Sequence, residues 1–490
     1  MILSIDQGTT GTTALLIDPA GRPIDRAYRE IRQYYPQPGQ VEHDPEDIWD
    51  SVCATCGDLL SRNTDKPKAI GLANQRETII VWDASTGRPV APAIVWQDRR
   101  TADICRRMRE EGLEPEIRER SGLLLDPYFS GTKIAWLLDS DPQLRRRAER
   151  GELRAGTVDS WLIWKMTDGA VHATDRTNAS RTLLLNLRTL DWDEASLGHF
   201  SIPRELLPTI IPSSGVAAET VEVGPFPEGI PLAGIAGDQQ AALYGQGCFG
   251  AGNAKNTYGT GCFYLRHTGS SCAISEHPIL TTVAASSGKQ AMYAFEGSVF
   301  VAGAAIQWLR DSAGFIKESE DCEQIALEVP DTAGVFFVPA FVGLGAPYWD
   351  PDARGAIVGL TRGATWKHIV RAALESITFQ VCDLLGVEEL GEGLDELRVD
   401  GGACRNDFLM QFQADLLGVP VNRPEQIETT ALGAAFLAGL AVGEWSSEDD
   451  LQNVRSSERI FEPSKAAENR QDLLHGWKEA VARVLTSKSR

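Results

Sequence analysis

The chain has 490 residues, of which 43% are hydrophobic and 23% are charged. This length predicts two or three domains, and the composition excludes a disordered or fibrous protein. With 47 basic and 68 acidic residues, the formal net charge is −21. That charge argues against general binding to nucleic acids or anionic membranes, while it still allows a small anion to be held in a local pocket.

The N-terminus and the cysteines predict a cytoplasmic protein. Asp6 cuts the first apolar run short and no basic residue precedes it, so we expect no secretory signal. The nine cysteines fit reduced thiols, and the single Cys53-x-x-Cys56 pair favours helix packing over metal or redox chemistry. Neither long uncharged stretch suits a membrane span, because prolines interrupt 332–349 and 429–443 is too short.

The first segment predicts a β-hairpin with a glycine- and threonine-rich tip. Residues 1–5 and 12–18 have the pattern of strands, and Gln7-Gly8-Thr9-Thr10-Gly11 lies between them. Further strand-like segments alternate with helical ones. This mixture favours an α/β fold.

The same pattern returns near the middle of the chain. A glycine cluster at 245–252 is followed by a strand-like segment, by the turn Tyr258-Gly259-Thr260-Gly261 and by a returning strand at 262–266. Two such units half a chain apart predict two related domains that face each other, residues 1–246 and 247–490.

The two Gly-Thr turns are candidates for binding phosphate. Successive backbone N–H groups in such a turn can form a nest for an anion, and threonine hydroxyls add donors. Asp6 ends the strand before the first turn and could help to hold Mg²⁺. The alternative is an ordinary hairpin. A Walker A motif is absent, and Gly245-x-Gly247-x-x-Gly250 follows a helical segment, so it does not meet the requirements of a dinucleotide fingerprint.

Three further motifs have both a functional and a plain interpretation. Arg76-Glu77 can bond hydroxyl groups of a ligand, or it can be a surface ion pair. Asp238, where an apolar strand gives way to a helix, can be a general base or an N-cap. Gly401-Gly402, between a strand and a helix, can lie against a flat ligand or form a simple turn.

Taken together, these motifs resemble the FGGY family of carbohydrate kinases, and within it the glycerol kinases. The likeness runs from about residue 2 to about residue 445. It is carried by Asp6-Gln-Gly-Thr-Thr10, Asn74-Gln-Arg-Glu77, Tyr128-Phe-Ser-Gly-Thr-Lys133, Gly237-Asp-Gln-Gln240, Asn256-Thr-Tyr-Gly-Thr-Gly-Cys262, Gly343-Leu-Gly-Ala-Pro-Tyr-Trp-Asp350 and Asp400-Gly-Gly-Ala403. The resemblance implies two actin-like, ribonuclease-H-like domains with a cleft between them.

The resemblance also implies the reaction and the residues that serve it. The reaction is ATP-dependent phosphorylation of a terminal hydroxyl of glycerol, with Asp238 as the base. The expected glycerol site, including two aromatic rings over the carbon face, is Arg76, Glu77, Trp96, Tyr128, Asp238, Gln239 and Phe263. The expected nucleotide site, from the phosphates to the nucleoside, is Thr9, Thr10, Gly11, Thr260, Gly303, Gln307, Gly402 and Asn406. Asp6 would hold Mg²⁺, through water. Relatives are often homo-oligomers, so a dimer or tetramer is expected.

One departure from the family pattern concerns the ATP phosphates. Most relatives have arginine at the position of Thr13, so this chain is expected either to bind ATP more weakly or to compensate with another basic residue. The nearest rival function is another sugar kinase of the family, such as xylulokinase. A more distant rival is an actin-like filament or an ATP-driven chaperone, which would not need Arg76, Glu77 and Asp238 to converge on a small polyol.

Overall fold

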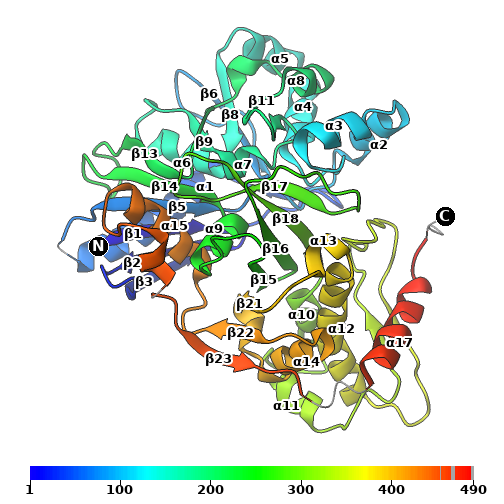
Figure 1. Cartoon of the computed structure of the whole chain (residues 1–490). Coiled ribbons are helices and arrows are strands. Elements are labelled where there is room, and N and C mark those ends of the chain that lie inside the picture. The colour runs from blue at the N-terminus through cyan, green and yellow to red at the C-terminus, as the bar shows by residue number, and fades with distance from the viewer. Residues whose placement is uncertain (64, 453, 465–468, 487–490) are drawn as a thin grey trace.

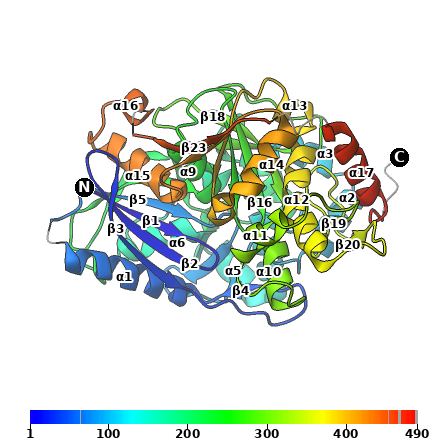
Figure 2. The same cartoon turned by 90° about the horizontal axis from the view of Figure 1, so that it is seen from below.

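The computed structural model describes residues 1–63, 65–452, 454–464 and 469–486. Two large β-sheets dominate it, one built by the first half of the chain and one by the second, and helices cover their faces (Figure 1). The view from below shows helix α1 along the strands β1, β2 and β3, with α10, α11, α12 and α14 of the second half on the other side of the molecule (Figure 2). The predicted α/β class is confirmed.

The first sheet joins antiparallel and parallel strands. β1 pairs antiparallel with β2, and β2 pairs antiparallel with β3; β1 pairs parallel with β5, and β5 parallel with β14. Along the sheet the order is β13 (Ser214–Glu219), β14 (Pro231–Gly237), β5 (Ala69–Asn74), β1 (Ile2–Gln7), β2 (Gly11–Ile17) and β3 (Pro23–Glu30).

The second sheet repeats this arrangement. β15 and β16 form an antiparallel hairpin, β16 pairs antiparallel with β18, and β15, β21 and β22 are parallel. The order is β17 (Leu280–Ala284), β18 (Met292–Val299), β16 (Cys262–Gly269), β15 (Ala254–Tyr258), β21 (Leu397–Asp400), β22 (Val421–Pro424) and β23 (Ser457–Phe461). The repeat inferred from the two Gly-Thr turns is therefore present in the topology as well.

Smaller sheets and the helices complete the fold. The remaining strands are β4 (Glu42–His43), β6 (Ile79–Asp83), β7 (Ala93–Ile94), β8 (Leu153–Thr157), β9 (Ala173–Asp175), β10 (Leu185–Asn186), β11 (Asp191–Trp192), β12 (Thr209–Ile211), β19 (Phe336–Val338) and β20 (Ala356–Val358). The helices are α1 (Pro45–Arg62), α2 (Ala102–Glu110), α3 (Glu114–Ser121), α4 (Ser130–Ser140), α5 (Pro142–Glu149), α6 (Val158–Met166), α7 (Arg176–Ala179), α8 (Glu194–Phe200), α9 (Asp238–Gly245), α10 (Gly303–Asp311), α11 (Asp321–Leu327), α12 (Trp366–Leu385), α13 (Glu388–Gly391), α14 (Asp407–Leu417), α15 (Thr429–Ala441), α16 (Glu448–Gln452) and α17 (Arg470–Ala482).

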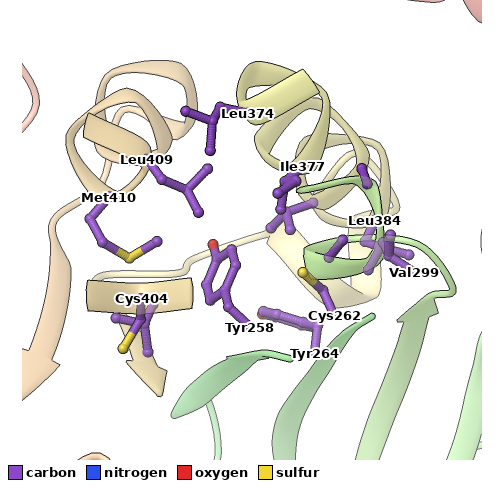
Figure 3. Close-up of a cluster of buried hydrophobic side chains, with 14 of the residues drawn as sticks. Tyr258, Cys262, Tyr264, Val299, Leu374, Ile377, Leu384, Cys404, Leu409 and Met410 are labelled. Atoms are coloured by element: carbon purple, nitrogen blue, oxygen red, sulfur yellow. The ribbon is translucent and has the colours of Figure 1, made fainter. Parts of the chain in front are cut away.

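The core of the second half lies between its sheet and the helices α12 and α14. Figure 3 shows Tyr258 between the strands and the helix side chains Leu409, Met410 and Ile377. Tyr258 is fully buried, and its hydroxyl donates to Gln413 Oε1 over 2.8 Å, so the polar end of the ring is satisfied inside the apolar cluster. This packing fixes the strand that leads into the second Gly-Thr turn.

Helix α15 ties the second half of the chain to the first sheet. It packs on β1, β5 and β14 and beside α9, and Figure 1 shows it (orange) next to β1 and β5. A buried helix was expected here, and its small residues explain the close fit. A Cβ on Gly433 would lie 1.8 Å from the Ala241 carbonyl oxygen, and one on Gly245 would lie 2.0 Å from that of Thr429. No helix in the described ranges is both long and apolar enough to cross a membrane.

Gly433→Ala tests the contact between α15 and α9. The added methyl group would overlap the α9 backbone, so we expect a loss of about 1–3 kcal/mol in the free energy of unfolding, measured by denaturant titration. The control is Gly198→Ala in α8, where a Cβ would meet nothing within 4 Å. The control should be neutral or slightly stabilising. Equal stability of the two variants would contradict the close approach.

Candidate active site

Three parallel strands of the first sheet end level with one another. Gln7 in β1 pairs with Asn74 in β5, and Asn74 pairs with Gly237 in β14. Because the carboxyl ends of parallel strands meet at one edge of a sheet, the segments that follow these residues lie side by side. Those segments carry the first Gly-Thr turn, the Arg76-Glu77 pair and Asp238.

A cleft of about 980 Å³ opens at this edge and extends to the second Gly-Thr turn. Most of the predicted site residues line it: Thr9, Thr10, Arg76, Glu77, Trp96, Tyr128, Asp238, Thr260, Phe263 and Gln307. Other predicted residues lie outside this lining: Asp6, Gly11, Gln239, Gly303, Gly402 and Asn406. The loop at 33–41 forms part of the wall, and no motif in the sequence pointed to it.

Asp238 is the first residue of α9, and the N-cap position is taken by Gly237. The plain interpretation of Asp238 as an N-cap is therefore wrong. Its Oδ1 accepts from the backbone N–H of Gln239 over 2.7 Å and lies 3.1 Å from Arg76 Nε. Within the described residues no hydrogen bond involves Oδ2. Burial raises the pKa of Asp238, and the guanidinium of Arg76 opposes that rise.

Arg76 and Glu77 are buried, so they are not a surface ion pair. Arg76 Nη2 lies 3.3 Å from the Tyr128 hydroxyl, and Glu77 Oε1 accepts from Arg181 Nε over 2.6 Å. Glu77 has a φ of 60°, a left-handed conformation that is uncommon outside glycine. Strained backbone of this kind is frequent where a protein must aim a side chain at a ligand.

Aromatic rings flank these polar groups. The Trp96 ring packs edge-on against Tyr128, with 5.7 Å between ring centroids, and against Phe263 at 6.1 Å. Trp96 Nε1 donates to Thr9 Oγ1 over 2.8 Å, so the ring is also fixed to the first Gly-Thr turn. The cleft thus offers an apolar face beside buried hydrogen-bonding groups, which suits a small polyol.

Both Gly-Thr turns are tight. Gly8 N–H donates to the Gly11 carbonyl, and Gly259 N–H donates to that of Gly261, each over 2.9 Å. Gly11 itself faces the neighbouring strand, because a Cβ there would lie 2.5 Å from the Arg29 carbonyl oxygen. Gly11 is not among the residues that line the cleft, and its contact with the nucleotide stays a prediction.

The residues expected at the nucleoside gather around the second turn. Gly303 N–H donates to the Gly259 carbonyl over 3.0 Å, and a Cβ on Gly401 would lie 2.6 Å from the Tyr258 carbonyl oxygen. A Cβ on Gly402 would meet nothing within 4 Å, so this glycine borders open space. Asn406 caps α14 by accepting from the Leu409 N–H over 2.8 Å.

Asp6 is the residue that we predicted to hold a cation, and it lies in a region of negative charge. Burial and the negative charges of Asp238 and Glu428 raise its pKa well above the ordinary value. A divalent cation would remove that repulsion, and carboxylate oxygens suit Mg²⁺. Nowhere in the described part of the chain do three or more His, Cys, Asp or Glu side chains gather in a metal-binding arrangement. An ion at Asp6 would therefore take most of its oxygen ligands from water and phosphate.

Three buried charged residues of the site were missed by the sequence reasoning. Lys255 Nζ donates to Gln239 Oε1, to Thr257 Oγ1 over 2.6 Å and to the Phe263 carbonyl. Arg181 and Glu296 are also fully buried and contact the Arg76-Glu77 pair. Each is the only charged residue in its segment: Lys255 in 245–265, Arg181 in 177–187 and Glu296 in 291–309. That isolation was the available signal.

Known proteins resemble this chain over nearly its whole length. It is 54% identical to the glycerol kinase of Symbiobacterium thermophilum over 99% of this chain and 98% of that protein, and 55% identical to that of Shewanella oneidensis over 99% of each. The crystal structure of Plasmodium falciparum glycerol kinase with ADP superposes with a TM-score of 0.92 at 36% identity, covering 99% of this chain and 98% of that one.

Family comparison divides the chain as its two sheets do. Residues 1–245 match the N-terminal domain of the FGGY family of carbohydrate kinases, and residues 254–442 match the C-terminal domain. The fold that these kinases share is the actin-like, ribonuclease-H-like one, as expected. The chain belongs to the FGGY family of carbohydrate kinases.

Proposed function

We propose that this chain transfers the γ-phosphoryl group of ATP to a terminal hydroxyl of glycerol, giving sn-glycerol 3-phosphate and ADP, with Asp238 as the general base. The observation that carries the proposal is the Asp238 carboxylate in the cleft, which Arg76 holds through Oδ1 and whose Oδ2 has no hydrogen bond to any described residue. The identity of 54–55% to glycerol kinases over nearly the whole chain supports the substrate.

Glycerol binds among Arg76, Glu77, Tyr128, Asp238 and Gln239. A guanidinium and a phenol donate hydrogen bonds, whereas the carboxylates accept them, so each hydroxyl of a polyol finds a partner. Trp96 and Phe263 pack against its carbon skeleton. A pocket whose polar groups pair with the hydroxyls of glycerol, and whose two rings cover its carbon atoms, rejects larger ketoses. This disfavours xylulokinase activity.

Proton removal at Asp238 is favoured by its surroundings. Because burial raises the pKa of this carboxyl, it is a stronger base than an aspartate in water. Free Oδ2 accepts the proton of the attacking hydroxyl while Oδ1 remains on Arg76. The hydroxyl proton of glycerol therefore moves to Asp238 as the glycerol oxygen attacks the γ-phosphorus of ATP.

The phosphates of ATP lie between the two Gly-Thr turns. Thr9, Thr10 and Thr260 donate to them, and Gly303, Gln307, Gly402 and Asn406 surround the nucleoside. Asp6 would hold Mg²⁺ through water, and the bound ion would neutralise phosphate charge. Phosphoryl transfer needs such charge neutralisation and in-line positioning more than covalent chemistry.

The division into domains 1–246 and 247–490, a homo-oligomeric state and a cytoplasmic location complete the proposal. The domain division is supported by the two separate sheets. The oligomeric state is tested by sedimentation of the purified protein, and the same experiment with ATP tests for a filament.

Asp238→Ala tests the base. Loss of the carboxylate should lower turnover at least ~10²-fold, the usual scale for a general base, in an assay of ADP release from MgATP with glycerol. Xylulose, ribulose, gluconate and dihydroxyacetone serve as alternative acceptors. The matched control is Asp44→Ala, which removes the N-cap of α1 and should cost about 1 kcal/mol of stability without changing turnover. Near-normal turnover in Asp238→Ala would remove Asp238 from this role.

Thr13 lies on β2 opposite Tyr28 and is nearly buried. Among the described residues that line the cleft, the cations are Arg76 and Arg99, and both are already paired with carboxylates. Neither of these two paired arginines in the described lining is free to replace the family's arginine. This arrangement favours weaker ATP binding over compensation.

Thr13→Arg should therefore strengthen nucleotide binding. One added charge-assisted hydrogen bond of about 1.5 kcal/mol corresponds to roughly a tenfold lower Kd for ATP, measured by calorimetry. Ile24→Arg is the control, because it adds the same charge at an exposed position of β3. An unchanged Kd in Thr13→Arg, or an equal gain in the control, would contradict the explanation.

A further inference from the structure

Four buried charged side chains form a closed network behind the glycerol pocket. Glu296 accepts from Arg76 through both oxygens, over 2.6 and 3.0 Å, and from Arg181 Nη2 over 3.0 Å. Arg181 Nε donates to Glu77 over 2.6 Å. All four side chains are at most 2% exposed. Two positive and two negative charges thus balance one another at a place that is almost completely shielded from water.

The network determines which edge of Arg76 faces the cleft. A guanidinium has five N–H groups. Both terminal nitrogens of Arg76 are on Glu296, with longer contacts of 3.3 Å to Gln240 and Tyr128, and Nε lies 3.1 Å from Asp238. A bidentate contact to a carboxylate fixes the plane of a guanidinium as well as its position. Glu296 therefore sets the direction of Nε.

Glu296 reaches this place from the other half of the chain. It lies on β18 of the second sheet, 220 residues from Arg76. Burial alone would raise the pKa of Glu296, but the guanidinium groups of Arg181 and Arg76 hold it down to about 2. The carboxylate is thus charged at neutral pH. A buried ion pair is weak evidence of a stabilising role, because desolvation offsets the attraction.

We propose that Glu296 is a positioning residue for glycerol phosphorylation: its two-oxygen contact holds Arg76 so that Nε lies beside the base Asp238 and Nη2 beside the Tyr128 hydroxyl, two groups of the glycerol pocket. Arg181 supports it by holding both Glu296 and Glu77. The proposal rests on the glycerol site described above, because it acts through Arg76 and Glu77. It gives the second half of the chain a part in glycerol binding beyond Phe263.

The test compares Glu296→Gln with Glu296→Asp. The glutamine keeps the size of the side chain and loses its charge; the aspartate keeps the charge and is one methylene shorter. We expect Glu296→Gln to raise the KM for glycerol at least tenfold and to lower kcat, with the KM for ATP changed less than twofold. Glu296→Asp should recover part of kcat/KM for glycerol relative to the glutamine variant, because it retains the charge that holds Arg76.

Glu375→Gln is the matched control. Glu375 is also a buried glutamate paired with an arginine, since Arg371 Nε donates to it over 2.8 Å within α12, and neither residue lines the cleft. This variant should lose stability in thermal unfolding while both KM values and kcat stay within twofold of the parent. If Glu296→Gln behaves in the same way, or if glutamine surpasses aspartate at position 296, Glu296 has only a packing role and the proposal is overturned.

Two further measurements keep the outcomes separate. Arg76→Met should raise the KM for glycerol as well. If it does not, the proposed glycerol site itself is wrong. If the KM for glycerol rises in Arg76→Met but not in the Glu296 variants, only the inference about Glu296 is overturned. Should Glu296→Gln fail to fold, as judged by circular dichroism, Glu296→Asp decides alone. An unchanged KM for glycerol in that variant would count against positioning, and a rise without a rise for ATP would support it.

Discussion

Gln7, Asn74 and Gly237 end three parallel strands at the same level, and the positions of the polar groups in the cleft follow from this register. A shift of one residue in β14 would turn the start of α9 away from Arg76, because side chains alternate between the faces of a sheet. Glycines on β5 and β14 let α15 pack closely on these two strands, and this packing helps to keep the register. A Cβ on Gly71 or Gly234 would lie within 2.5 Å of the α15 backbone.

Local features of the fold were predictable because they depend on local chemistry. The hairpin tips contain residues that favour tight turns, and the small residues at 429–443 indicated a buried helix, which the structure shows as α15. Its location was not predictable. A composition rich in alanine and glycine predicts close packing but not the packing partner. Along the chain α15 lies between β22 and β23 of the second sheet, yet it packs on the first sheet.

The partners of the candidate site residues were not predictable from the sequence either. The pair Arg76-Glu77 suited a surface ion pair equally well in the sequence, because adjacent residues carry no information about burial. Its environment is set by Arg181 and Glu296, which are 104 and 220 residues away along the chain. No periodicity links such positions. A lone charge in an uncharged stretch was the one local sign of them, and it marks burial without giving the partner.

The balance of buried charge explains why so many ionised groups can share the site. Arg76, Arg181 and Lys255 offset Glu77, Glu296 and Asp238, so the resting cluster is formally neutral. Burial lowers the pKa of Lys255 to about 8, which still leaves this lysine mostly protonated at neutral pH. In the proposed reaction Asp238 takes the proton of glycerol, so the net charge of the cluster would rise by one. That charge would arise beside the phosphoryl group in transfer, where fixed hydrogen-bond donors and positive groups shielded from water stabilise negative charge most effectively. In the proposed reaction these six side chains would therefore carry a net positive charge only after Asp238 has been protonated.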